Sequence, residues 1–342
     1  SSTGDNNVAI GYNSMLANTT GAENVAVGYG ALIANTTASN NTALGRSSLE
    51  ANTTGGSNVA VGRDALGANT TASNNTAVGY NSLNANTTGT QNTALGALAG
   101  DAVTTGTENL AVGYLSLSAS TTGSGNVAVG KSALSSDTQG SSSTAVGQLA
   151  LSSQNLTSAT EAQNTAVGNQ AGRYITSGVQ NVLLGGLATT DAADNDRAIV
   201  IGYNVSGGQD YTTLGNAAND IRAAHGTATW AAVSDERYKK DITDSTTGLS
   251  FINALRPRTF KYRNLGELPE TFRAYKADST EVFKNSDTNH GFIAQEVKAA
   301  IDADSGLKDG FRLWDDRDDG SQEVAEAALI PILVKAIQEL TA

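Results

Sequence analysis

A repeat with a constant period of 17 residues occupies the first part of the chain. Its unit is N-[VTL]-A-[VIL]-G, which begins at Asn7, Asn24, Asn41, Asn58, Asn75, Asn92, Asn109 and Asn126. A fixed short period indicates a solenoid, in which successive repeats stack as coils. Seventeen residues are too few for two packed helices and a turn, and the aliphatic residues alternate at i and i+2, as strands require. The repeat therefore predicts a parallel β-solenoid with one coil per 17 residues.

The series continues beyond the eighth unit with one interruption. Its later glycines are Gly147, Gly168, Gly185, Gly202 and Gly215. A four-residue insertion around residues 153–161 delays the second of these, and the last closes on a shorter step. We therefore expect the solenoid to occupy residues 1–215, with an irregular outer loop at the insertion.

Other repeat positions indicate how the coils fill their interior. Four residues after the repeat glycine is an aliphatic column: Met15, Leu32, Leu49, Leu66, Leu83, Leu117, Leu134 and Leu151. The asparagines at the head of each unit and in the recurring N-T-T can form amide ladders, and the glycine supplies a tight corner. A coil this thin, with few aromatic residues, has little core of its own. We therefore expect three chains to share a common interior as a homotrimer.

Charge is distributed unevenly and marks a domain boundary. Residues 1–233 contain six Lys or Arg and thirteen Asp or Glu, whereas residues 234–342 contain fifteen and twenty. We therefore predict a neck over residues 216–233 and a separate domain over residues 234–342. The net charge of −12 argues against nucleic acid and anionic membranes as partners. The chain has no cysteine and no apolar run of membrane length, so neither a disulfide framework nor membrane insertion is expected.

Four blocks in the second part of the chain resemble a known family. They are SDERYKKDI (residues 234–242), LSFINALRPRTFKYR (residues 249–263), HGFIAQEVKAAI (residues 290–301) and LIPILVKAIQEL (residues 329–340). Their order is similar to that of the intramolecular chaperone auto-processing domain at the C-termini of phage tailspikes, endosialidases and tail fibres. The resemblance implies a helix followed by a strand, a second helix and a terminal helix. It also implies that Ser234 and Lys239 form a self-cleaving dyad.

The residues at the junction can be weighed without the family. Ser234 supplies a nucleophile, and Lys239 can act as base only in its neutral form, which burial or cationic neighbours favour. A lone S-x4-K pair is usually a solvated surface, so the downstream blocks carry the catalytic interpretation. Attack of the hydroxyl on its own preceding carbonyl is an N-to-O acyl shift, which favours the bond between Val233 and Ser234. The bond after Ser234 is the alternative. Such an activity would be intramolecular and single-turnover, with no external substrate.

The terminal block predicts a helix with an apolar seam. Pro331 suits the first turn of a helix, and aliphatic residues follow a 3, 4, 3 spacing: Ile330, Leu333, Ile337 and Leu340. This spacing is typical of a short coiled coil, so we expect these four side chains to hold the trimer together.

The repeats carry a second resemblance. Units such as NVAVGYGAL and NTAVGYNSL resemble the head repeats of trimeric autotransporter adhesins, which are parallel β-rolls, and similar repeats occur in phage fibres. With both resemblances, the expected function is a fibre or tailspike segment for host attachment, made in the host cytoplasm and carried on the virion. Its C-terminal domain would drive trimerisation and then release itself. The alternative is a structural or adhesive surface module whose trimerisation domain stays attached.

The position after the repeat glycine forms a column along one line of the rod, with four tyrosines. They are Tyr12, Tyr29, Tyr80 and Tyr114, interspersed with arginines. A plain solvent-facing or inter-chain ladder is the favoured interpretation, and a stripe that binds a host glycan is the alternative. The expected receptor of the fibre is a cell-surface glycan or protein. An ice-binding face built from the N-T-T threonines is disfavoured because adjacent residues point to opposite faces.

The sequence contains no metal or cofactor signature. His225 and His290 are the two histidines and have no cysteine partners, which favours ordinary polar packing over metal binding. The acidic run at residues 315–319 lacks the spacing of a calcium loop, so we interpret it as a solvated loop.

Overall fold

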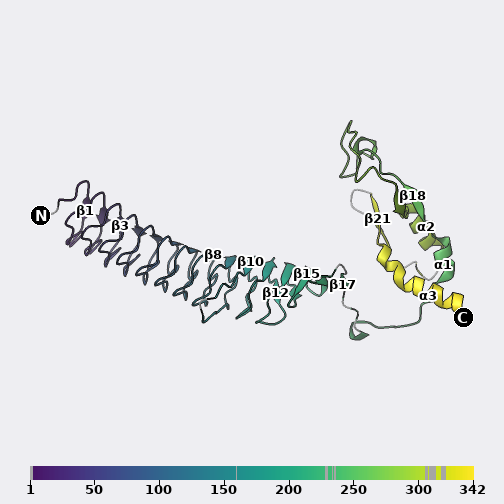
Figure 1. Ribbon diagram of the computed structural model, residues 1–342, viewed down its shortest axis with the longest axis horizontal. Coiled ribbons are helices and arrows are strands. Elements are labelled where there is room, and N and C mark those ends of the chain that lie inside the picture. The colour runs from purple at the N-terminus through teal and green to yellow at the C-terminus, as the bar shows by residue number, and fades with distance from the viewer. Residues whose placement is uncertain are drawn as a thin grey trace. The chain divides into compact units, whose positions relative to one another are not determined.

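The chain forms two compact units, Ser1–Ser234 and Asp235–Ala342. The computed structural model describes residues 3–158, 160–227, 230–232, 234, 236–304, 307, 313–316 and 321–342. The first unit is a parallel β-solenoid, and the second is a smaller α+β region that ends in a helix (Figure 1). This architecture confirms the predicted fold class of the single chain.

One short strand per coil builds the solenoid sheet. The strands are β1 (Val8–Ile10), β2 (Val25–Val27), β3 (Thr42–Leu44), β4 (Val59–Val61), β5 (Thr76–Val78), β6 (Thr93–Leu95), β7 (Leu110–Val112), β8 (Val127–Val129), β9 (Thr144–Val146), β10 (Thr165–Val167), β11 (Val182–Leu184) and β13 (Ile199–Tyr203). Neighbouring strands are parallel and pair equivalent repeat positions, as Ala26 does with Ala43. The extra residues of the interrupted coil lie outside this ladder, because β9 and β10 keep the same register, with Thr144 opposite Thr165.

The predicted aliphatic column fills the interior of the coils. Its leucines are almost completely buried, and all eight members have left-handed backbones with φ from 47° to 53°. A leucine in this region costs about 1–2 kcal/mol, and burial of its side chain returns about 1.5–3 kcal/mol. Gly100 and Gly172 occupy this position in two coils, where the fully buried Val103 and Ile175 fill the interior instead.

Buried asparagines satisfy the backbone at the corners of each coil, which confirms the predicted amide ladders. Asn41 donates its backbone N–H to Oδ1 of Asn24 at 2.9 Å and its side-chain amide to the carbonyl of Gly55 at 3.0 Å. Fully buried polar groups must find such partners. The repeat glycine has a positive φ, and a Cβ on Gly62 would lie 2.5 Å from the carbonyl oxygen of Gly79. Glycine is therefore required both by conformation and by the close approach of the next coil.

Antiparallel strands follow the last parallel strand. β12 (Thr189–Thr190) and β14 (Ser206–Gly207) form a separate two-stranded parallel sheet. In the main sheet, β13 pairs in parallel with β15 (Tyr211–Asn216). From there β16 (Asn219–Ala224) and β17 (Ala231–Ala232) run antiparallel in the same sheet. Both strands lie within residues 216–233, so the stretch predicted as a neck contains strands of the solenoid sheet. The three-part division of the chain stays a prediction.

The second unit places three helices around a small core. Its elements are η1 (Glu236–Tyr238), α1 (Leu249–Ala254), β18 (Arg258–Phe260), η2 (Leu265–Glu267), β19 (Asn289–Gly291), α2 (Ala294–Ala303), β20 (Trp314–Asp316), β21 (Gln322–Val324), η3 (Glu326–Leu329) and α3 (Ile330–Thr341). β18 pairs with β19 and β20 with β21, both antiparallel. The core contains Phe251, Leu255, Val297, Ala300, Ile301, Leu313, Leu329 and Ile332.

The predicted helices are present, with one shift. The helix and strand of residues 249–263 are α1 and β18, and the terminal helix is α3, with Pro331 as its second residue. The second helix begins at Ala294 rather than His290, because His290 pairs with Thr259 in the β18–β19 ladder. No helix in the described part of the chain is both long enough and apolar enough to cross a membrane.

Candidate functional site

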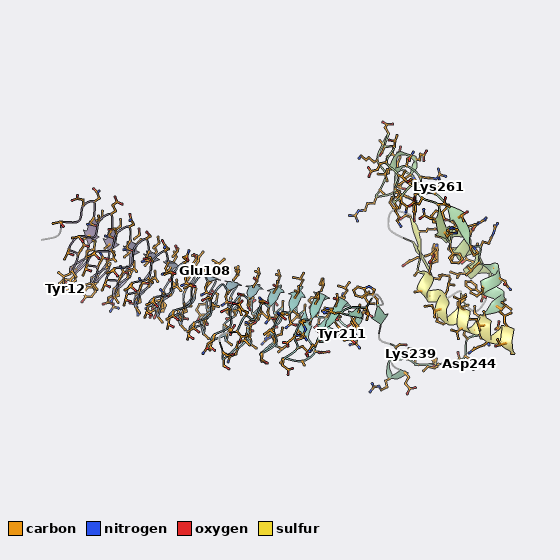
Figure 2. All side chains as sticks on the ribbon, viewed as in Figure 1. Tyr12, Glu108, Tyr211, Lys239, Asp244 and Lys261 are labelled. Atoms are coloured by element: carbon orange, nitrogen blue, oxygen red, sulfur yellow. The ribbon has the colours of Figure 1, made fainter. Side chains whose placement is uncertain are left out.

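The predicted dyad lies at the boundary between the two units. Ser234 is the last residue of the first unit and is exposed, and Lys239, in the second unit, is exposed as well. Between them, η1 forms a single turn, with the backbone N–H of Lys239 bonded to the carbonyl of Glu236 at 2.9 Å (Figure 2). Val233 lies outside the described residues. The alignment of hydroxyl and amine for catalysis therefore stays a prediction.

The terminal helix α3 has two apolar faces. Ile332 and Ala336 are buried in the core of the second unit. The predicted seam is exposed in the single chain: Ile330 by 61%, Leu333 by 42%, Ile337 by 60% and Leu340 by 68%. A contiguous exposed apolar stripe on a helix marks an interaction surface. The seam is therefore available to other chains, although its role in trimerisation stays a prediction.

A carboxylate near the end of α3 holds this helix to α1. Oε2 of Glu339 accepts the backbone N–H of Leu249 at 2.8 Å, and the same carboxylate lies so close to Gly248 that a Cβ there would overlap it. Negative charge at a helix N-terminus is favourable because the first N–H groups lack partners. This contact ties the end of α3 to the start of α1, in a unit where Ile332 is buried in the core and the seam is exposed.

The outer face of the solenoid sheet carries a second, partly exposed apolar surface, which we name the aliphatic strip. It consists of the third residue of β1 to β11 and of β13: Ile10, Val27, Leu44, Val61, Val78, Leu95, Val112, Val129, Val146, Val167, Leu184 and Ile201. Ile10, Leu44, Leu95, Val167 and Ile201 are exposed, and the other seven are partly buried. Leu44 and Leu95 are 47% and 50% exposed, whereas the alanine at the centre of each strand faces the interior and is buried. Sequence reasoning found the alternation but not which face each residue takes; the constant alanine was the available signal.

The four tyrosines predicted as a glycan stripe lie on the surface of the solenoid. Their exposed fractions are 68% for Tyr12, 55% for Tyr29, 43% for Tyr80 and 48% for Tyr114. The rings of Tyr12 and Tyr29 stack with centroids 5.4 Å apart, and the guanidinium of Arg63 lies over the ring of Tyr80. These contacts cover ring faces that a sugar would use for stacking. Binding of a glycan here stays a prediction.

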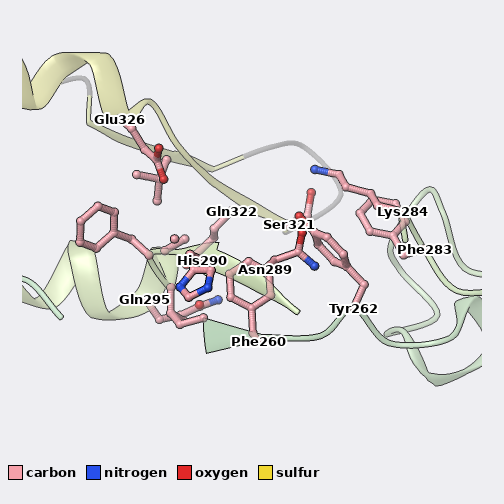
Figure 3. A pocket seen from close by; sticks show the side chains of 15 residues that line it. Phe260, Tyr262, Phe283, Lys284, Asn289, His290, Gln295, Ser321, Gln322 and Glu326 are labelled. Carbon is pink, nitrogen blue, oxygen red and sulfur yellow. The ribbon is translucent and has the colours of Figure 1, made fainter. Parts of the chain in front are cut away.

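The second unit contains a cavity of about 700 Å³ that brings together distant segments (Figure 3). Phe260, Tyr262 and Phe283 form successive edge-to-face contacts along one wall, and the amine of Lys284 lies 5.2 Å from the centre of the Tyr262 ring. His290 also lines the cavity. The sequence did not predict this cavity, because residues 260–262, 283–295 and 321–326 meet only in the fold.

An ion pair joins strand β18 to helix α2 in the second unit. Nε of Arg258 on β18 donates to Oε2 of Glu296 on α2 at 2.9 Å, and a second guanidinium nitrogen pairs with the other oxygen. These hydrogen bonds lower the pKa of the Glu296 carboxyl below its usual value. Within the described residues, no group of three His, Cys, Asp or Glu side chains is placed to hold a metal ion.

Comparison with known proteins gives one match. The family described as chaperone of endosialidase matches residues 234–305. None of the curated proteins and none of the solved structures compared with the chain matches it. The matched segment begins at Ser234 and includes η1, α1, β18, β19 and α2. Together with the solenoid, it fits a fibre protein of the endosialidase type with a C-terminal chaperone region.

Proposed function

We propose that the chain is a segment of a homotrimeric fibre or tailspike for host attachment, whose residues 234–342 assemble three chains and then cut themselves off. One observation carries the proposal: the family match begins at Ser234, where the compact solenoid unit also ends. A chaperone that starts where its client ends can be removed by a single cut. The fibre would act on the virion after synthesis in the host cytoplasm, with a cell-surface glycan or protein as receptor.

Two exposed apolar surfaces support association of identical chains. The aliphatic strip runs along the coils of the first unit, and the seam of α3 is a separate exposed apolar surface of the second unit. Contiguous apolar surfaces of this length are unfavourable in water and are normally covered by partners. Parallel coils in three identical chains can bring their strips to one axis, with the seams forming a short three-helix bundle.

The proposed reaction is an acyl shift followed by hydrolysis. Oγ of Ser234 attacks the carbonyl carbon of Val233 while Nζ of Lys239 removes the hydroxyl proton. The amide C–N bond breaks as its nitrogen takes up a proton, which leaves an ester between Val233 and Ser234. Water hydrolyses this ester to the Val233 carboxylate and the Ser234 hydroxyl. Lys239 is exposed in the single chain, and burial of its amine by neighbouring chains would favour the neutral form that a base requires.

Denaturing electrophoresis of freshly expressed chain tests the proposal against a module that never cuts itself. We expect two products, residues 1–233 and residues 234–342, in place of one band at 34.8 kDa. Mass spectrometry of the smaller product distinguishes a cut before Ser234 from a cut after it. A single full-length band from a soluble trimer would instead identify a permanent structural or adhesive module.

Substitution of Leu95 by aspartate should prevent trimerisation of the solenoid without unfolding its coil. Leu95 lies on the aliphatic strip and is half exposed in the single chain, so its own coil tolerates the charge. Three buried carboxylates at one axis should lower the association constant at least about a hundredfold, because an unpaired buried charge costs several kcal/mol. Sedimentation velocity measures this change. Thr88→Asp, at an exposed turn off the strip, is the control and should leave the trimer intact.

A further inference from the structure

The cavity of the second unit combines a wall of aromatic rings with polar side chains around it (Figure 3). Phe260, Tyr262 and Phe283 form the aromatic wall, and the centroids of neighbouring rings are 5.4 and 5.7 Å apart. Amide and carboxyl side chains, among them Gln295 and Glu326, line the same space. Its volume of about 700 Å³ lies within the range of about 300–1,000 Å³ that is typical of small-molecule sites. The lining therefore suits a ligand that has both apolar and polar faces.

Hydrogen bonds of the chain itself hold the aromatic wall in place. The backbone N–H of Phe283 donates to the carbonyl of Arg263 at 3.0 Å, which fixes its segment against the chain that follows β18. Beyond Lys284, the side-chain amide of Asn289 donates to the carbonyl of Asp287 at 2.9 Å and so braces the loop before β19. A wall that is already ordered loses little conformational entropy when a ligand binds.

Lys284 places a positive charge at one end of this wall. Its amine lies 5.2 Å from the centre of the Tyr262 ring and 5.6 Å from the centre of the Phe283 ring. Among the described residues, no carboxylate forms an ion pair with this amine. Figure 3 shows Glu326, which also lines the cavity, at the opposite end. The amine can therefore receive a carboxylate from a ligand.

We propose that this cavity binds an oligosaccharide that carries a carboxylate, such as a chain of uronic acids. The sugar carboxylate pairs with the amine of Lys284, and the C–H face of a sugar ring stacks on the ring of Phe260. Sugar hydroxyls exchange hydrogen bonds with Gln295 and Glu326. A purely apolar ligand would cover these polar groups without giving them partners, which is unfavourable. The site is separate from the solenoid tyrosines, and the inference does not depend on self-cleavage.

Calorimetric titration of the full chain tests the proposal, with Ser234→Ala in every sample so that the second unit stays attached. Digalacturonate is the probe, and the corresponding neutral digalactose is its matched control, because the two differ only in their carboxylates. We expect digalacturonate to bind at least about tenfold more tightly than digalactose, since one charge-assisted contact is worth that much. Equal affinity for the two sugars, or no saturable binding of digalacturonate, would overturn the proposal.

Lysine variants separate a specific site from attraction by net charge. Lys284→Gln should lower the affinity for digalacturonate to that for digalactose and leave the latter unchanged, whereas Lys284→Arg should keep the preference. Lys276 is exposed, pairs with Glu281 and lies outside the cavity, so Lys276→Gln should bind both sugars as the parent chain does. Circular dichroism checks the fold of each variant. Unchanged binding in Lys284→Gln, or the same loss in both glutamine variants, would remove Lys284 from the site and overturn the assignment.

Discussion

Replacing Ser234 with alanine should leave the chain as one full-length band, with no detectable release of residues 234–342. The same result is expected for Lys239→Ala and for Lys239→Arg, because a guanidinium stays protonated and cannot act as base. The change removes one hydroxyl or one amine next to η1 and leaves the aliphatic strip and the seam of α3 intact, so trimer assembly should be unchanged. Denaturing electrophoresis measures scission, and native sedimentation measures assembly.

The neighbouring lysine supplies the control for this experiment. Lys240 is also exposed and adjoins Lys239 in sequence, so Lys240→Ala should release the fragment at the wild-type rate. Normal release from either the Ser234 or the Lys239 variants would remove those residues from the mechanism. Loss of release in all variants, Lys240→Ala included, would indicate that the whole junction is sensitive and that the dyad assignment is wrong.

Deleting residues 234–342 from the gene should leave the solenoid aggregated or poorly folded. Strands β1 to β11 are three residues long, and each pairs with the strands of neighbouring coils. A register error would therefore move the aliphatic strip to another face. Parallel pairing of this kind nucleates slowly, so three chains need an element that sets their alignment. Light scattering and circular dichroism of the truncated chain measure the outcome.

The same residues, 1–233, should behave differently when they are produced by cleavage. A trimer that folded with the chaperone attached should remain assembled after the cut, held by its unfolding barrier rather than by the lost contacts. Resistance to protease before and after release measures this persistence. A truncated gene product that folds unaided into a trimer of equal resistance would disprove the chaperone role, even if the dyad cuts as proposed.

Much of the solenoid could be predicted because its information is local and repeated. The 17-residue period, the i and i+2 alternation and the aliphatic column together predict one strand per coil and an aliphatic side chain in the interior of most coils. The helices of the second unit were identified by resemblance and by the spacing in the terminal block. The start of α2 was placed four residues early, because the pairing of His290 with Thr259 joins residues 31 positions apart.

Other features of the fold depend on contacts between coils and helices that the sequence pattern alone does not reveal. Intrinsic preference opposes a left-handed backbone at Leu66, and only burial between neighbouring coils compensates for it. In another coil, Gly100 stands at the repeat position that Leu66 has in its own coil. The structure explains this glycine, because the buried side chain of Val103 fills the interior there. Leu95 and the seam of α3 are exposed because neighbouring elements pack against the opposite side of the strand and of the helix.

At the candidate site, the sequence by itself predicted which groups react, and the tertiary structure determined which elements surround them. Ser234, Lys239 and the seam from Ile330 to Leu340 could be named from spacing and resemblance, since these depend on residues close together in the chain. The pairing of β17 with β16 and the cavity around Tyr262 could not. The cavity joins segments that are far apart in the chain. The β17–β16 pair spans only nine to eleven residues, but it needs a β16 that is already held in the sheet by β15. Both therefore depend on the packing of whole elements, which local preferences do not encode.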